Sequence, residues 1–124
     1  MTRINTGIQP EELPDKLLLA ELREIKRIPN VIRQGKYNMK GIPEEFTLGQ
    51  GHVKFFYNKL KYLLDRYNAL RQEALQRGFN VSDWSDAWNG VPAQLMNDYV
   101  ETKRDREILL ERIAEKGFEL RRSG

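Results

Sequence analysis

Arg23, Glu24 and Arg27 are charged residues close together in a segment with helical periodicity. Residues four apart share one face of a helix, so the two arginines point the same way and Glu24 lies beside them. Guanidinium groups bind phosphates in a bidentate manner, and a partly desolvated carboxylate can transfer protons at a bound substrate. The alternative is an ion pair on a hydrated helix surface, which contributes little to stability. Sequence spacing alone leaves both interpretations open.

The N-terminus offers a nucleophile. Thr2 has a small side chain, which favours enzymatic removal of Met1 and leaves the α-amine of Thr2 at the start of the chain. An α-amine has a reference pKa of about 8, against about 10.4 for lysine, so more of it is neutral and nucleophilic at pH 7. Such an amine can attack an aldehyde-like sugar carbon and form an imine. Few proteins use their N-terminus in catalysis, so this remains one of two possibilities.

Basic residues occur in two segments that are far apart in the sequence. Lys and Arg number 21 against 18 Asp and Glu, so the net charge is only +3 and the distribution matters more than the total. Arg112 and Lys116 are four apart, on one face of a helix. If the two segments pack side by side, they form a positive face suited to a phosphate backbone. Otherwise, both are solvated helix faces. The two basic segments are Arg23, Lys26, Arg27, Arg33, Lys36 and Lys103, Arg104, Arg106, Arg112, Lys116, Arg121, Arg122.

Composition excludes several classes of chemistry. The chain has no cysteine, and His52 is its single histidine. Disulfides, thiolate catalysis and a Cys- or His-rich metal site are therefore excluded, and we expect no metal and no other cofactor. No apolar run is long enough for a membrane helix, and no secretory signal is present, so we expect a cytoplasmic protein that does not bind membranes. With 124 residues, positions 1–124 are expected to form one domain.

The elements that must position these residues begin with an arm and a long helix. Residues 2–9 lack helical periodicity and are predicted to form an extended arm. Apolar residues then recur at spacings of three and four through residues 13–35, which predicts the first helix. Pro29 lies inside this pattern and removes a backbone donor, so we expect a kink there. We expect a kink rather than an end because Ile32 continues the apolar stripe.

Two further helices and two irregular connections follow. Residues 36–51 are predicted to be a long connection, pinned to the core by Ile42, Phe46 and Leu48. The apolar pattern predicts a second helix over 56–77, ended by Gly78, and a third over 101–118. The segment 79–92 is rich in turn residues, and its tryptophans, Trp84 and Trp88, are expected to cover the core. The predicted fold is an all-α domain of three main helices.

Several blocks of the sequence together resemble a known family. The blocks, in order, are Met1-Thr2-Arg3-Ile4-Asn5, then Leu13-x-Asp15-x-x-Leu18-x-Ala20-Glu21-x-Arg23-Glu24-x-x-Arg27, then Phe46-x-Leu48-Gly49-x-Gly51-His52-Val53-x-Phe55-Phe56-Tyr57-x-Lys59-Leu60, then Arg77-Gly78-Phe79-Asn80 and Asp98-Tyr99. They resemble the pyrimidine-dimer DNA glycosylase/AP lyase family of the phage endonuclease V type. The resemblance covers nearly the whole chain, and the block around Gly51-His52-Val53 is the most distinctive.

The resemblance implies a three-helix protein whose N-terminal arm threads between the helices. In that family, the terminal amine attacks C1′ of the damaged nucleotide, expels the base and forms an imine, after which β-elimination cuts the strand. Carried over by position, Thr2 is the nucleophile and Glu24 the catalytic carboxylate. The implied partner is double-stranded DNA with a damaged base or abasic site, bound by a monomer without a metal. The implied phosphate contacts are Arg3, Arg23, Arg27, Arg112 and Lys116.

Two departures from the family pattern concern lesion recognition. Lys16 and Leu17 stand where the phage members have glutamine and histidine, and the sequence after Phe118 lacks their tail of tryptophan and tyrosines. Imine chemistry is therefore more firmly implied than a pyrimidine dimer as the lesion. Two alternatives remain open: a non-catalytic helical DNA-binding module on the same scaffold, and a protein-interaction bundle whose basic charges only confer solubility.

Overall fold

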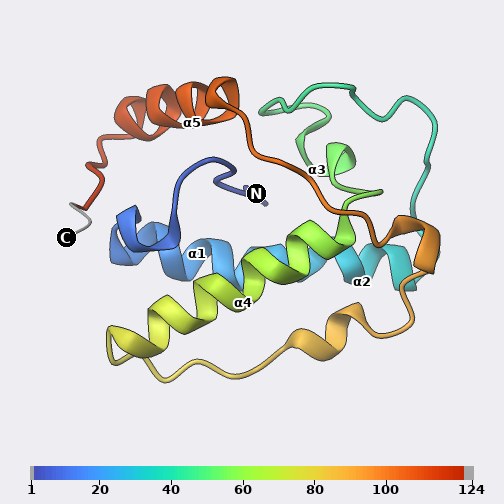
Figure 1. The fold of residues 1–124 in the computed structure, drawn as a ribbon, viewed down its shortest axis with the longest axis horizontal. Coiled ribbons are helices and arrows are strands. Elements are labelled where there is room, and N and C mark those ends of the chain that lie inside the picture. The colour runs from blue at the N-terminus through green and yellow to red at the C-terminus, as the bar shows by residue number, and fades with distance from the viewer. Residues whose placement is uncertain (1, 122–124) are drawn as a thin grey trace.

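A computed structural model describes residues 2–121, and in this range the chain forms helices without any β-strand. The α-helices are α1 (Asp15–Ile25), α2 (Arg27–Arg33), α3 (His52–Phe55), α4 (Leu60–Gln76) and α5 (Lys103–Glu115). Short 3₁₀ turns lie at Pro10–Glu12, Ser85–Trp88 and Ala93–Leu95. The prediction of an all-α fold with long irregular connections is confirmed (Figure 1).

The first predicted helix is divided at Lys26 into α1 and α2. Lys26 keeps helical dihedral angles (φ −69°, ψ −12°), so the chain bends and does not leave the helical region. The division follows from Pro29, because proline has no N–H to donate to the carbonyl of Ile25 four residues earlier. Ile32 is buried beyond the break. The predicted kink is confirmed, and it ends α1 just after the Arg23-Glu24 pair.

The second predicted helix begins later than the apolar pattern indicates. Phe56 is fully buried, but it belongs to the turn that follows α3, and α4 starts only at Leu60. The cause is Lys59, whose backbone (φ −133°, ψ 41°) lies outside the helical region. The predicted start at residue 56 is therefore wrong by four positions. The predicted stop is confirmed, since Gly78 adopts φ +90°, which glycine accepts without strain.

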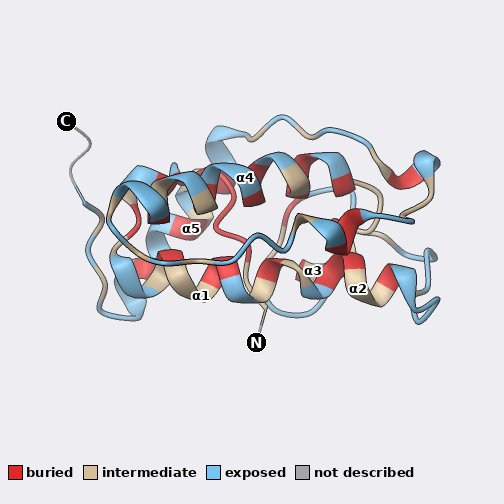
Figure 2. Cartoon of the chain, turned by 90° about the horizontal axis from the view of Figure 1, so that it is seen from below, coloured by how far each residue is buried: buried red, intermediate tan, exposed pale blue. Residues whose placement is uncertain are grey.

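The core lies where α1 and α4 pack along each other (Figure 2). Each helix contributes one stripe of buried side chains at helical spacing. The connection before α3 contributes the buried Phe46, whose ring makes edge contacts with Phe55 and Phe56. The buried apolar side chains of α1 and α4 include Leu18, Leu22, Ile25, Leu60, Leu63, Tyr67 and Leu70.

Helix α5 begins with a reciprocal cap. Thr102 Oγ1 accepts a hydrogen bond from the Asp105 amide at 3.1 Å, and the Thr102 amide donates to Asp105 Oδ2 at 3.0 Å. These bonds satisfy backbone donors that a helix start leaves unpaired. Leu109 and Ile113 then bury the inner face of α5. This arrangement sets α5 on the side of the N-terminal arm away from α1 (Figure 1).

The two tryptophans have different environments, contrary to the prediction that both cover the core. Trp88 is buried and donates from its indole N–H to the carbonyl of Leu60 at 3.0 Å. Trp84 is 53% exposed, and the ammonium of Lys26 lies 4.4 Å from the centre of its ring. The prediction is correct for Trp88 and wrong for Trp84, which precedes the 3₁₀ turn Ser85–Trp88 and lies at the surface.

Candidate functional site at the N-terminal arm

The N-terminal arm passes between α1 and α5 with its residues buried from Ile4 to Ile8. Asn5 Nδ2 donates to Glu21 Oε1 of α1 at 2.8 Å, and the carbonyl of Ile8 accepts from Arg66 of α4 at 3.0 Å. The Ile4 amide donates to Nε2 of His52 at 2.9 Å. The arm is therefore held by α1, α4 and the start of α3, and the predicted threading between helices is confirmed.

Glu21 and Arg66 form a buried ion pair beneath the arm. Nε and NH2 of Arg66 lie 2.5 and 3.0 Å from the two carboxylate oxygens, and the side chains are 0% and 4% exposed. Burial alone disfavours the charge of Arg66, but the adjacent Glu21 raises the pKa of Arg66 above its ordinary value. The same carboxylate orients Asn5. Glu21 thus links the position of the arm to helices α1 and α4.

A pocket of about 210 Å³ opens where the arm crosses α1. The arm contributes Arg3, α1 contributes Glu24, and the residue after α5 contributes Lys116. Three of the residues singled out from the sequence therefore line one pocket, although they are up to 113 positions apart, from Arg3 to Lys116. The remaining lining residues are Asn5, Leu17, Ala20 and Glu21.

Glu24 is shielded from solvent in this pocket. The expected ion pairs with Arg23 and Arg27 form at an exposed edge of the pocket, where the Glu24 side chain is 13% exposed and the two arginines are 68% and 59% exposed. Oε1 lies 3.6 Å from Nε of Arg23, and Oε2 lies 2.7 Å from NH1 of Arg27. The contact with Arg27 is an ion pair at an angle that makes no hydrogen bond, so within residues 2–121 the buried Oε2 lacks a hydrogen-bond partner. Arg27 therefore offsets the charge of this oxygen without satisfying it as a hydrogen-bond acceptor.

Positive charge surrounds the pocket on both sides. Arg23 and Arg27 are 68% and 59% exposed beside Glu24. Burial, and then the charge of Arg112, lower the pKa of Arg3 below its ordinary value, which places Arg112 close enough to Arg3 to repel it. Several basic side chains thus gather around one pocket, and a local excess of positive charge favours an anionic ligand.

Thr2 lies next to this cluster on the arm. It is half-buried and precedes Arg3, so their Cα atoms are about 3.8 Å apart across one peptide bond. Thr2 is not among the side chains that line the pocket. The removal of Met1, on which a nucleophilic Thr2 depends, concerns a residue outside the described range.

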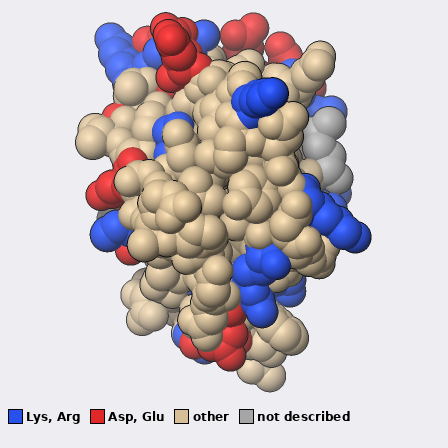
Figure 3. Space-filling view, turned by 90° about the vertical axis from the view of Figure 1, so that its right-hand side faces the viewer, with Lys and Arg blue, Asp and Glu red and all other residues tan. Residues whose placement is uncertain are grey.

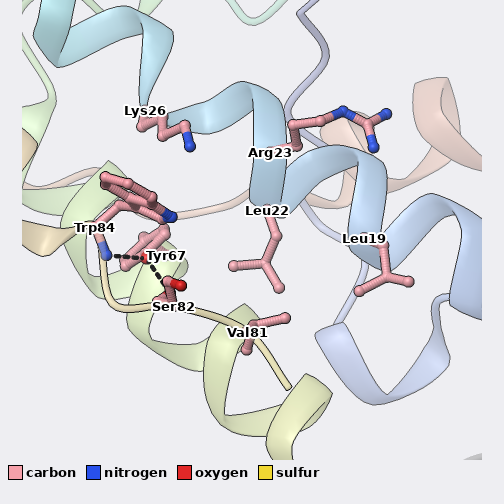
Figure 4. Close-up of a pocket in the computed structure, with 8 residues that line it drawn as sticks. All are labelled: Leu19, Leu22, Arg23, Lys26, Tyr67, Val81, Ser82 and Trp84. Carbon is pink, nitrogen blue, oxygen red and sulfur yellow. Dashed lines mark hydrogen bonds between the residues drawn. The ribbon is translucent and has the colours of Figure 1, made fainter. Parts of the chain in front are cut away.

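A second pocket, of about 180 Å³, lies on the other flank of α1 (Figure 4). Arg23 lines it on one side and the exposed ring of Trp84 on the other, with Lys26 directed towards that ring. Tyr67 fixes the wall, because its hydroxyl accepts from the Trp84 amide at 2.6 Å and donates to the Ser82 carbonyl at 3.3 Å. Helix α1 thus separates the two pockets, and Arg23 borders the second one.

Charge is distributed unevenly over the surface. At the end of the molecule where α2 and the following connection lie, uncharged side chains cover most of the visible face, and basic and acidic side chains are scattered singly over it and along its edge (Figure 3). This end is therefore less suited to a phosphate backbone than the pocket with Arg3 and Lys116.

Sequence reasoning missed the residues that hold the arm. Asn5, Glu21 and His52 lie within the resembling blocks, but no role was assigned to them, and Arg66 was not singled out. A usable signal existed for Arg66, because it falls three residues after Leu63 and four before Leu70, on the buried stripe of a predicted helix. A buried arginine requires an acidic partner, although spacing does not identify it.

The described residues contain neither a cluster of potential metal ligands nor a helix suited to cross a membrane. In residues 2–121, no three or more His, Asp or Glu side chains gather closely enough to hold a metal ion. The helices in this range are too short or too polar to span a membrane.

Comparison with protein families gives a match over residues 1–85 to the model described as pyrimidine dimer DNA glycosylase. The matched range contains Thr2, Arg3, Glu21, Glu24 and the Gly51-His52 block. Arg112 and Lys116 follow the matched range. Lys116 lines the pocket, whereas Arg112 does not line it and is linked to it only by its charge effect on Arg3. The match covers more than half of the 124 residues. The chain therefore belongs to the pyrimidine dimer DNA glycosylase family, a family of DNA repair enzymes.

Proposed function

We propose that this protein is a DNA glycosylase with AP-lyase activity, in which the α-amine of Thr2 is the nucleophile and Glu24 accepts and donates protons. One observation carries the proposal: Arg3, adjacent to Thr2 on the arm, and the shielded carboxylate of Glu24 line the same pocket. A nucleophilic amine next to a partly desolvated carboxylate is the combination that imine chemistry at a sugar carbon requires.

The proposed reaction has two stages. The neutral amine of Thr2 attacks C1′ of the damaged nucleotide, the bond from C1′ to the base breaks, and the base leaves with a proton. Opening of the sugar ring gives an imine between Thr2 and C1′. Loss of a proton from C2′ then expels the 3′ phosphate by β-elimination, and water releases the cleaved product from the amine. Glu24 stabilises the positive charge that develops on the sugar and accepts or returns protons at each stage.

Phosphate binding is assigned to the basic residues around the pocket. Arg23 and Arg27 present exposed guanidinium groups beside Glu24, while Arg3 and Arg112 gather on the arm side together with Lys116. These side chains lie on both sides of the Glu24 carboxylate, as contact with the backbone around a single damaged nucleotide requires. The proposed ligand is double-stranded DNA, bound by a cytoplasmic monomer without a metal.

Leu17 and Lys16 are assigned to the choice of lesion. Leu17 lines the pocket, whereas Lys16 is exposed, and its ammonium lies 5.8 Å from the centre of the Phe118 ring. An apolar side chain at the pocket wall favours a damaged base with apolar surface over one that needs a hydrogen bond there. We propose a pyrimidine dimer as the first lesion to test, followed by other modified bases.

The test is borohydride trapping on a duplex with a single abasic site. The proposal predicts a covalent protein–DNA adduct with the wild type, and binding without strand cleavage by Glu24→Gln. Arg33→Gln, on α2 away from the pocket, is the matched control and should trap and cleave like the wild type. DNA binding without any wild-type adduct would instead support a non-catalytic DNA-binding module. Comparison of abasic with dimer-containing duplexes then separates lyase activity from lesion choice.

A further inference from the structure

His52 makes two hydrogen bonds that together define its chemical form. Its Nδ1 lies 2.8 Å from the carbonyl oxygen of Thr47, and its Nε2 lies 2.9 Å from the amide nitrogen of Ile4. A carbonyl oxygen can only accept, and a backbone N–H can only donate. Nδ1 must therefore carry the hydrogen and Nε2 the lone pair, which is the neutral Nδ1–H tautomer.

The surroundings of His52 keep the ring in place. It is 3% exposed, and Phe46 and Phe56 contact it edge-on, with ring centres 5.4 and 5.5 Å away. Gly51, directly before it, adopts φ +89°, a conformation that positions the ring at the start of α3 and that side-chain-bearing residues rarely adopt. The ring therefore cannot turn to exchange its two partners without moving the core.

The charged groups that face His52 come from two elements. Arg3 of the arm opposes a positive charge on the ring, and Glu21 of α1 favours one. Burial is the largest influence and lowers the pKa of His52 below its ordinary value, so the ring is neutral at pH 7. A protonated ring would direct a second N–H at the Ile4 amide, where two donors would face each other.

Resting on the function proposed above, we propose that neutral His52 is a positioning residue for the Thr2 amine. The Ile4 nitrogen is two residues from the Thr2 nitrogen, a span of at most about 7 Å of extended chain. The bond from Ile4 to His52 thus holds the arm backbone at a point only two residues from the amine. It fixes where the arm emerges from the core and holds the amine at the pocket with Glu24.

Nothing in this role requires His52 to touch the substrate. A displacement of about 1 Å at a reacting group is enough to reduce a rate about a hundredfold. Loss of the acceptor should therefore reduce the rate of imine formation far more than the affinity for DNA, which depends on several separate cations.

The direct test uses the fact that the chain has a single histidine, so its imidazole nitrogens give one unambiguous set of ¹⁵N signals. The free wild-type protein at pH 7.5 should show a protonated Nδ1 and an unprotonated Nε2. A ring protonated on Nε2, or on both nitrogens, would overturn the proposal. This measurement needs no DNA, so it stands even if the wild type forms no adduct and the proposed enzymatic function is thereby contradicted.

The functional test compares two substitutions in single-turnover trapping on abasic DNA. His52→Leu fills the ring's space without an acceptor and should lower the trapping rate by about tenfold to a hundredfold, with little change in DNA affinity. His52→Gln offers a carbonyl to Ile4 and an amide to Thr47, and should recover most of that loss. Leu70→Val, a core change away from the arm, controls for a general loss of stability. A wild-type rate in His52→Leu, or no recovery in a folded His52→Gln, would contradict the proposal.

Discussion

The carboxylate of Glu21 and the guanidinium of Arg66 form a fully buried pair that joins α1 to α4 directly beneath the N-terminal arm. Glu21 also accepts a hydrogen bond from the Asn5 side chain, and Arg66 also donates one to the Ile8 carbonyl. One ion pair thus connects the packing of the two main core helices to the path of the arm. Several consequences can be measured without knowledge of the lesion.

Glu21→Gln should destabilise the protein strongly. The change keeps the shape of the side chain but removes the closer of the two carboxylates beside Arg66, leaving its buried charge with Glu101, whose Oε2 lies 3.6 Å from NH1. Breaking a buried ion pair by removing one partner typically costs about 3–5 kcal/mol. The new amide would also direct donors at Asn5 and Arg66. Urea unfolding at pH 7.5 gives the free energy. Asp65→Asn, which removes the exposed partner of Lys61, should leave that free energy essentially unchanged. Equal effects of the two variants would show that Glu21 contributes no more than a surface charge.

Gly7→Ala should displace the arm. Gly7 adopts φ +91°, and a methyl group there would lie 2.8 Å from the Arg106 backbone nitrogen of α5, so either the arm or α5 must move. Gly35 has a similar φ of +72° but open space around it. We expect Gly35→Ala to cost about 1 kcal/mol from backbone strain alone, and Gly7→Ala to cost clearly more. Thermal unfolding of both variants measures the difference, and equal losses would rule out steric contact with α5.

Stability should fall in mildly acidic solution because of His52. Burial lowers the pKa of His52 in the folded protein below its ordinary value near 6.5. Below pH 6.5 the unfolded chain binds a proton that the folded chain does not, so stability present above that pH is lost as pH falls through the folded pKa. Urea unfolding between pH 8 and pH 5 should show this decline in the wild type. The free energy of unfolding of His52→Gln should fall less between pH 6.5 and pH 5 than that of the wild type, because the variant lacks this titrating group. Identical pH profiles of the two proteins would contradict the assignment to His52.

DNA affinity should depend on salt in proportion to the phosphates contacted. Arg27 is 59% exposed beside the pocket, and removing one phosphate contact reduces the slope of log affinity against log salt by about 0.9. Arg27→Gln should therefore bind duplex DNA more weakly and with a shallower slope. Lys61→Gln, which removes an exposed lysine paired with Asp65, should leave the slope unchanged. Fluorescence anisotropy at several salt concentrations provides the comparison.

Periodicity predicted the helices well because each one buries a single apolar stripe. The stop at Gly78 and the bend before Pro29 follow from local backbone chemistry, which a sequence displays directly. The start of α4 was predicted too early because Phe56 fits the helical spacing although the Lys59 backbone breaks the helix. Phe56 is buried partly because the ring of Phe46 packs against it. Phe46 belongs to the connection before α3, and the path of such a connection cannot be predicted from local sequence patterns.

The candidate site was predicted in part, for a related reason. Arg23 and Glu24 lie in α1 and Arg27 begins α2 directly after the bend, so their spacing in the sequence was enough to place them together. Arg3 and Lys116 join them only through the path of the arm and the packing of α5. The contacts of Asn5 with Glu21, and of Ile4 with His52, connect residues 16 and 48 positions apart. Such pairs depend on tertiary packing, so the residue types alone gave no indication of them.

In the proposed reaction, the N-terminal amine of Thr2 forms the covalent bond to DNA. The most direct measurement is the mass of the intact protein as isolated, followed by borohydride trapping on an abasic duplex and peptide mapping of the adduct. We expect protein that lacks Met1 and an adduct that carries the sugar remnant on the α-amine of Thr2. A remnant on a lysine side chain, or no adduct from protein that begins at Thr2, would contradict it.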